Sequence, residues 1–137
     1  MAFSGYLIKL GGSSGTVLPL SYMKLESYKC TPDQRLETEA QRTATGLLVR
    51  TTVDHKPVKI EFETPPMTNR EMAALNTMIQ SAFTNNTERK LTINFYDNET
   101  DSYRNAECYM PDTDYSINRI VGNTIYYSSV RFAFIEY

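Results

Sequence analysis

The chain has 137 residues, of which 41% are hydrophobic and 22% charged, so its length and composition fit one ordinary globular domain. Its 14 basic and 16 acidic residues give a net charge of −2 and form no basic stripe, which argues against specific nucleic-acid binding. No apolar run approaches the length of a membrane span, and the first ten residues lack the pattern of a signal peptide. We therefore expect a soluble protein with a single domain, residues 1–137, that is made in a cytoplasm and has no membrane partner.

The first third of the chain predicts short strands. Residues 6–10 alternate apolar and polar side chains, and residues 22–29 alternate again. Residues 17–20 contain Pro19, which suits an edge strand rather than a central one. The chain also has ten Tyr and no Trp, and Tyr favours strands and interfaces, where a ring with a polar tip is useful.

Residues 30–46 are the least apolar part of the chain, with Leu36 as their only large aliphatic residue. We expect a long polar loop here, and the pattern leaves open whether it is functional or only a solvated or disordered connection. Glu37, Glu39 and Ala40 could support a short helical turn within it.

Residues 47–53 and 58–63 predict a β-hairpin. Apolar and charged side chains alternate strictly over residues 58–63, as expected for a strand with one wet face. The connection between the two segments has turn residues, and Pro57 is placed well just before a strand.

A helix is predicted at residues 69–83. Thr68 and Glu71 have the spacing of a capping box, in which each side chain satisfies a backbone N–H of the first turn. Apolar residues then recur at helical spacing and form one stripe that can lie on a sheet: Leu75, Met78, Ile79, Ala82 and Phe83.

The last third predicts antiparallel strands. Residues 91–96 and 103–110 are joined by an acidic turn, and residues 115–120 and 125–135 are joined by a turn at residues 121–123. Strands on both sides of one helix predict a mainly β fold, an antiparallel sandwich or barrel with the helix packed alongside.

The residue types of catalysis and metal binding are sparse. The single histidine, His55, has no partner of metal-ligand type nearby, and a surface position is expected. Cys30 and Cys108 are far apart in sequence and outside any C-x-x-C pattern, so we expect free thiols. No phosphate-binding glycine loop or nucleophile motif occurs. We expect a protein that is not an enzyme and uses no cofactor.

One acidic turn has oxygen ligands at alternate positions. Asp97, Glu99 and Asp101 could approach a cation as the residues of a calcium loop do. The glycine and the distant glutamate of an EF-hand loop are missing, and a polar turn between two strands explains the same residues.

The order of several short motifs resembles small tail proteins of phages and prophages of Gram-positive bacteria. The motifs are an Arg-Thr-x-x-Gly element at 42–46 followed by Leu-Leu-Val-Arg, a Lys-Ile-x-Phe strand at 59–62, a Pro-Pro-x-Thr helix start at 65–68 and a Phe-Tyr-Asp turn at 95–97. The resemblance implies a tail-tube-like fold and a structural subunit of the virion tail, made in the bacterial host cytoplasm. It also implies rings of copies of the chain, most often hexamers, that stack along the tail or sit at its distal end, as well as contacts with tube, tape-measure or baseplate components.

In that family the long early loop reaches a neighbouring subunit or the next ring, which favours a contact role for the polar segment described above. Its alternating charges suit pairing across subunits, although an exposed charged surface is the simpler alternative. The subunit-contact candidates are Gln34, Arg35, Leu36, Glu37, Glu39, Arg42 and Arg50.

A second hypothesis is a carbohydrate- or protein-binding module. Exposed tyrosines in the late strands could form stacking surfaces for a ligand, and about half of them should face the core instead. The candidates are Tyr103, Tyr109, Tyr115, Tyr126 and Tyr127.

Overall fold

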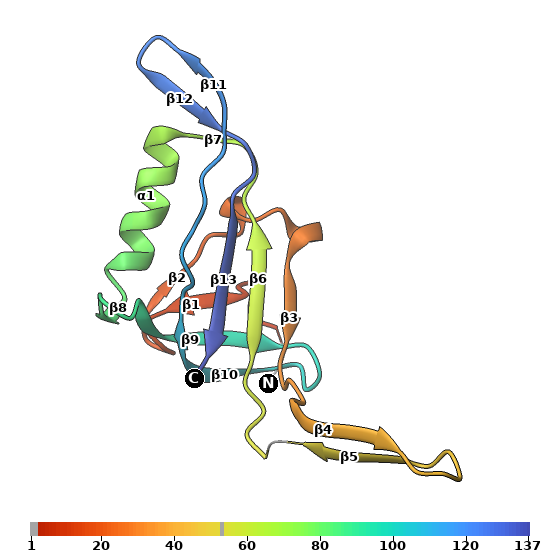
Figure 1. Ribbon diagram of the computed structural model, residues 1–137. Helices are drawn as coiled ribbons and strands as arrows, with labels where there is room; N and C mark the ends of the chain where they lie inside the picture. Colours follow the sequence, from red (N-terminus) through yellow and green to blue (C-terminus); the bar gives the residue numbers. More distant parts are fainter. Residues whose placement is uncertain (1–2, 53) are drawn as a thin grey trace.

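The computed structural model describes residues 3–52 and 54–137 and is mainly β, with antiparallel sheets and one helix (Figure 1). The strands are β1 (Ile8–Leu10), β2 (Thr16–Val17), β3 (Lys29–Thr31), β4 (Glu37–Arg42), β5 (Leu48–Thr52), β6 (Lys59–Glu63), β7 (Met67–Thr68), β8 (Phe83–Asn85), β9 (Lys90–Asp97), β10 (Ser102–Tyr109), β11 (Ile117–Val121), β12 (Thr124–Tyr127) and β13 (Arg131–Glu136). The helix α1 spans Asn69–Gln80, and two short 3-10 turns lie at Leu20–Tyr22 and Leu25–Ser27.

The main sheet has eight strands and is sharply bent. Its order is β2-β1-β9-β10-β13-β6-β3, and β8 pairs with β9 outside this path. β9 and β10 pair along eight residues, whereas β10 and β13 share only two residue pairs. Figure 1 shows β13, β6 and β3 crossing β9 and β10 steeply, so the short β10–β13 pairing is the corner of the sheet.

The core lies between this bent sheet and α1. Val58, Ile60 and Phe62 are buried while Lys59 and Glu61 between them are partly exposed, which confirms the alternation predicted for this strand. Buried residues of the helix, β6, β9 and β13 belong to one cluster with these side chains, including Leu75, Ile79, Phe95, Phe132 and Phe134.

The capping box at the start of α1 is confirmed. The backbone N–H of Glu71 donates to Oγ1 of Thr68 at 3.4 Å, and the N–H of Thr68 donates to Oε1 of Glu71 at 3.2 Å. The predicted end at residue 83 is three residues too long, because Phe83 pairs with Leu91 at the start of β8.

The strand predicted at residues 22–29 is wrong, since half of it lies in the two 3-10 turns and β3 begins only at Lys29. The hydroxyl of Ser27 donates to the carbonyl of Lys24 at 2.6 Å, and the N–H of Lys24 donates to Glu63. Such local side-chain to backbone bonds favour a turn over an extended strand.

The predicted hairpin of residues 47–53 with 58–63 is also wrong. β5 pairs with β4, while β6 lies between β3 and β13. The segment expected to be a polar loop at 30–46 therefore contains the end of β3 and all of β4, and its expected helical turn is a strand. A tight turn explains the pairing: the N–H of Thr43 donates to the carbonyl of Leu47 at 2.7 Å, and Gly46 has a φ of +87°. Val53 lies outside the described residues.

The hairpin of β9 and β10 is confirmed, and so is the turn between β11 and β12. Gly122 has a φ of +60° at the first central position of that two-residue turn, as a type II′ turn requires. The long strand predicted at 125–135 is divided into β12 and β13, because the chain passes from the three-stranded sheet to the main sheet between them. Val130 lies in this connection, and its backbone forms hydrogen bonds with buried Thr64.

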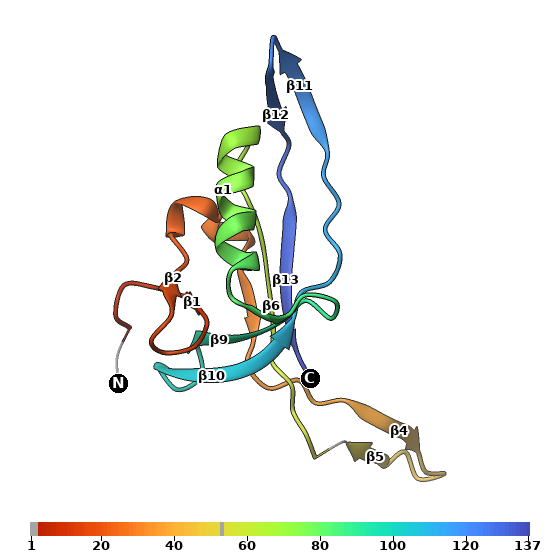
Figure 2. The same cartoon turned by 90° about the vertical axis from the view of Figure 1, so that its left-hand side faces the viewer.

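Two hairpins extend from the body at opposite ends, as both ribbon views show (Figures 1 and 2). The β4–β5 hairpin covers residues 37–52 and forms a sheet of its own, and the β11–β12 hairpin covers residues 117–127 and joins β7 in a three-stranded sheet. Within the described part of the chain, no helix is long and apolar enough to cross a membrane.

Candidate assembly surface

The β4–β5 hairpin is built from local bonds and from one cross-strand ion pair. Its strands pair from Glu37 opposite Thr52 to Arg42 opposite Leu48, with a bulge near residue 38. Nη1 of Arg42 donates to the carbonyl of Gly46 at 2.9 Å, which ties the strand to its turn. Arg50 and Glu37 form an ion pair across the hairpin.

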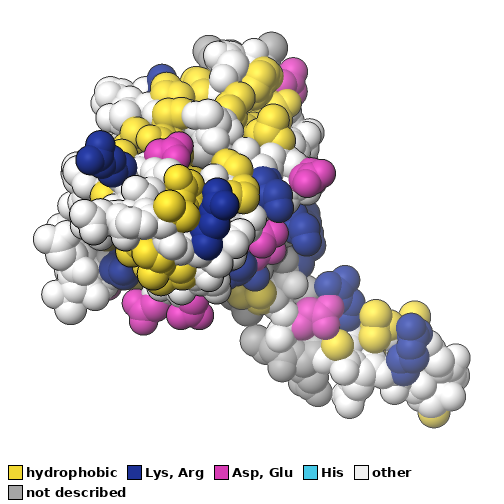
Figure 3. All heavy atoms as spheres, turned by 90° about the horizontal axis from the view of Figure 1, so that it is seen from above, with side chains coloured by type: hydrophobic (Ala, Val, Ile, Leu, Met, Phe, Trp, Pro, Cys, Tyr) yellow, Lys and Arg dark blue, Asp and Glu magenta, His cyan; other side chains and the backbone are white. Residues whose placement is uncertain are grey.

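This hairpin has no core of its own. Its side chains within the described residues are all exposed, and Leu47, at 68% exposure, is among the most exposed large hydrophobic residues of the protein. Leu48 and Val49 follow it and, being adjacent in a strand, point to opposite faces. Figure 3 shows hydrophobic and charged side chains along an arm that extends away from the body.

An isolated two-stranded hairpin is only marginally stable in water. Among the described residues, β4 and β5 form ladders only with each other. Exposed aliphatic side chains on both faces of such a hairpin are expected to be covered in use, so the geometry suits insertion against another surface.

All seven predicted contact residues lie on this hairpin or just before it. Gln34, Arg35 and Leu36 lead into β4, and Leu36 is exposed. The N–H of Gln34 donates to the carbonyl of Pro57 at 3.0 Å, which joins the two legs of the hairpin at its base. The remaining four are Glu37, Glu39, Arg42 and Arg50, and the side chain of Glu39 lies outside the described part.

Two of the residues expected to form charge pairs across subunits already form an ion pair within the chain. Glu37 and Arg50 pair with each other within the chain, because the register of β4 and β5 brings them to neighbouring positions of the hairpin. Arg35 is also occupied locally, since its Nη1 donates to the carbonyl of Asp33 at 2.9 Å.

Arg104 fixes the base of the hairpin to the body. From β10, its Nη2 donates to the carbonyl of Pro32 at 2.9 Å and lies 3.5 Å from Oδ1 of Asp33. Its Nε lies 3.0 Å from Oδ2 of Asp97, whose side chain is buried. The sequence analysis missed this residue; its only visible signal was a cation a few residues after an acidic turn.

Two carboxylates of the acidic turn, those of Asp97 and Asp101, bind other groups of the protein. Oδ1 of Asp97 accepts the N–H of Glu99 at 2.9 Å, and Oδ1 of Asp101 accepts the hydroxyl of Tyr96 at 2.7 Å. The bond to Asp101 raises the pKa of Tyr96 above its usual value. Over residues 3–52 and 54–137, no group of three His, Cys, Asp or Glu residues could hold a metal ion.

Of the five tyrosines considered for ligand stacking, Tyr103 is the most tightly engaged. Its ring stacks on Tyr6 with centroids 4.4 Å apart, and its hydroxyl donates to the carbonyl of Tyr6 at 2.8 Å. It also accepts the N–H of Ser4 at 2.8 Å, so this side chain holds the N-terminal segment against the sheet.

The other four rings also contact the same chain. Tyr109 packs edge-on against Tyr137, and the exposed Tyr115 lies beside Tyr127. The guanidinium of Arg119 lies over the ring of Tyr126, with 4.6 Å to the centroid. These contacts give the tyrosines roles in joining segments of the fold.

Cys30 and Cys108 are free thiols, as expected. Burial raises the pKa of both to about 12, and for Cys30 the nearby Asp97 adds to the effect. A thiol with such a pKa ionises little near neutral pH and is a poor nucleophile.

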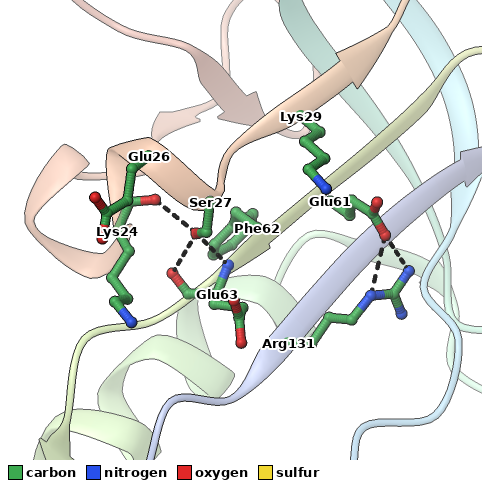
Figure 4. A pocket seen from close by; sticks show the side chains of 8 residues that line it. All are labelled: Lys24, Glu26, Ser27, Lys29, Glu61, Phe62, Glu63 and Arg131. Carbon is green, nitrogen blue, oxygen red and sulfur yellow. Dashed lines mark hydrogen bonds and ion pairs between the residues drawn. The ribbon is translucent and has the colours of Figure 1, made fainter.

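A shallow depression of about 520 Å³ lies on the outer side of β6 and β13 (Figure 4). Acidic and basic side chains alternate around it, and Arg131 pairs with Glu61 across the sheet. That bond lowers the pKa of Glu61. The sequence analysis did not single out this surface, and its paired charges are typical of the wet face of a sheet.

Comparison with curated proteins and with solved structures found no match. A family model does match the chain, and it covers residues 1–137. The chain therefore belongs to DUF6711, a family of unknown function.

Proposed function

We propose that this protein is a structural subunit of a bacteriophage tail, or of a phage-derived tail, and that copies of it form rings, most often hexamers. The observation that carries the assembly role is the β4–β5 hairpin, which extends from the body with exposed aliphatic side chains on both faces. The link to tails comes from the resemblance in short motifs. One of these, residues 42–46, forms the turn of this hairpin.

Two features of the fold support a tail-tube-like subunit: the bent main sheet with its one helix, and the short edge strands of that sheet. The main sheet turns a corner and packs around one helix, which supports a sandwich- or barrel-like domain. The edge strands of this sheet, β2, β3 and β8, have two, three and three residues and offer little edge for pairing. The two projecting hairpins are therefore better sites for contacts between copies than the edges of the main sheet.

In the proposed ring, the β4–β5 hairpin of each subunit lies on its neighbour, and other faces contact tube, tape-measure or baseplate proteins. The same two different surfaces meet at every contact, and rotation closes such a series into a ring. The tail is then the site of action, and the protein needs no catalytic group.

The test replaces residues 37–52 with a short Gly-Ser linker. The body should still unfold in one cooperative transition, because none of the hairpin side chains that the structure describes belongs to the core. The unaltered protein should form rings or larger oligomers, and the linker variant should form none. Native mass spectrometry and electron microscopy measure both.

A finer pair of variants separates the hairpin from exposed hydrophobic residues in general. Replacing Leu47 and Val49 by Ser should weaken assembly, while Leu25→Ser, which removes an exposed aliphatic side chain from the body, should leave it intact. A strictly monomeric wild-type protein at high concentration that also fails to join tail particles would refute the proposal.

A further inference from the structure

The β11–β12 hairpin has a free strand edge at the end of the molecule opposite the β4–β5 hairpin (Figure 2). Among residues 3–52 and 54–137, the order in its sheet is β11-β12-β7, so β12 is paired on both sides and β11 on one side only. Hydrogen-bonded and non-hydrogen-bonded residue pairs alternate along the hairpin, starting with a hydrogen-bonded pair next to the two-residue turn. Ile120 and Ile125 form the next pair, which is not hydrogen-bonded. The N–H and C=O of Ile120 therefore point away from β12, towards the free edge.

The side chains along this edge are unusually apolar for an exposed strand. Ile117, Ile120 and Val121 are 52%, 62% and 56% exposed. Natural edge strands are protected by charges, proline or strong bulges, and β11 has only Arg119 and one bulge of this kind. The bulge near residue 118 lies away from the turn, where Ile120 and Val121 stand.

The charges of this hairpin indicate its partner. Residues 115–127 contain one charged side chain, Arg119, and no carboxylate. In the other hairpin, β4 carries two glutamates and one arginine, which gives it a net charge of −1, whereas the only charge of β5 is Arg50, which already pairs with Glu37. A strand with Arg119 is thus complemented by β4, on which Glu39 is the second carboxylate. Strand length does not distinguish the two strands, since β11 and β5 have five residues and β4 has six.

We propose that the free edge of β11 pairs with the free edge of β4 from a second copy of this chain. The proposal rests on the proposed structural function, and it names which two surfaces meet. Main-chain bonds between the edges supply affinity, and the aliphatic residues of both hairpins supply the buried area. Because the two hairpins lie at opposite ends of one molecule, the pairing joins different copies.

Cross-linking of single-cysteine variants between mixed populations tests the pairing. One population carries Ile120→Cys and the other Ala40→Cys or Gln41→Cys, and a short bismaleimide tolerates one or two residues of uncertainty in register. The native thiols can stay, because Cys108 is fully buried and the pKa of both is raised to about 12. Wild type and a population with Glu107→Cys, an exposed position on β10, are the controls.

The expected result is a mixed cross-link between β11 and β4 in most of the assembled protein, and little product with the Glu107→Cys partner. Assemblies that form without this cross-link would overturn the pairing and leave the structural role standing. Predominant coupling of Ile120→Cys to itself would also overturn it, in favour of a symmetric β11–β11 contact. A wild-type protein that never assembles would refute the structural role as well.

A backbone variant gives a second readout. Ile120→Pro removes the outward N–H together with the side chain, whereas Ile120→Ala removes only the side chain and keeps the donor. Ile120→Pro should weaken assembly at least tenfold more than Ile120→Ala does, measured by sedimentation at matched concentrations. Equal effects of the two variants would show that main-chain pairing at this edge is not used.

Discussion

Single residues explain how a chain with many short strands keeps its segments in register. Arg104 contacts Pro32, Asp33 and Asp97, and its guanidinium lies 5.2 Å from the centroid of the Phe95 ring. The segment at residues 32–33 and the β9–β10 hairpin, which are distant in sequence, thereby meet at one side chain. The geometry of a planar guanidinium suits this role because it offers donors in several fixed directions.

Arg104→Ala should lower the free energy of unfolding by about 1–3 kcal/mol, because it removes the ion-pair partner of a buried carboxylate. The partial exposure of Arg104 keeps the loss below that of a fully buried pair. Urea denaturation measures the change. Arg104→Lys retains the charge but not the fork of donors, and should fall between wild type and alanine; a loss for lysine as large as that for alanine would contradict a charge contribution.

Glu61 predicts a pH dependence of stability. Its bond to Arg131 lowers the pKa of the folded state, so the stabilisation is present above the usual glutamate pKa and is lost as the pH falls through the lowered value. Thermal unfolding from neutral pH to about pH 3 should therefore show a smaller acid-induced loss in Glu61→Gln than in wild type. Glu63→Gln on the same strand is the control, and an identical acid response of wild type and Glu61→Gln would exclude this contribution.

At the scale of elements, local chemistry decided which predictions are confirmed. The capping box at Thr68 and the alternation over residues 58–63 follow from neighbours in sequence, and both are confirmed. The partner of a strand does not follow from its own pattern. β5 has a plausible sequence neighbour in β6, but β6 is paired on both sides by β3 and β13, which come from distant parts of the chain.

The same difference between local sequence patterns, which can be predicted, and strand pairing, which cannot, applies to the candidate assembly surface. Residues 30–46 stand out in the sequence because Leu36 is their only large aliphatic residue, and the family resemblance gives this segment a contact role. Its pairing with residues 48–52 was not predicted, since the register depends on the turn at residues 43–46. The β11 edge was missed because a strand with Ile and Val is expected to be buried, and only the fold shows that it is exposed.

The cap of α1 gives a prediction at this scale. Thr68→Ala should lower the free energy of unfolding by about 1 kcal/mol, since an N–H of the first turn loses its acceptor. Thr77→Ala is the matched control: its hydroxyl donates to the carbonyl of Ala73 inside the helix, where a backbone bond already exists. Equal losses for the two variants, measured by thermal or urea unfolding, would argue against a capping role for Thr68.

For the whole molecule, the contrast between a packed body and exposed hairpins predicts a contrast in dynamics. In the monomer, backbone amides of β4 and β5 should exchange with solvent fast, because few contacts hold this hairpin closed, while amides of β6, β9 and β13 should exchange slowest. Assembly should slow exchange in the hairpin by at least tenfold. Hydrogen–deuterium exchange before and after assembly measures both, and strong protection of the hairpin in the monomer would contradict its independence from the body.

The position of β6 has a mechanical consequence. Its N-terminal end leads back to the base of the β4–β5 hairpin, and its C-terminal end leads through Thr64 to β7 beside the β11–β12 hairpin. Tension applied between two neighbours that hold these hairpins would thus travel along the covalent backbone of one central strand. The ladders to β3 and β13 would be loaded in shear, where several bonds must break together, rather than opened one at a time like a zipper.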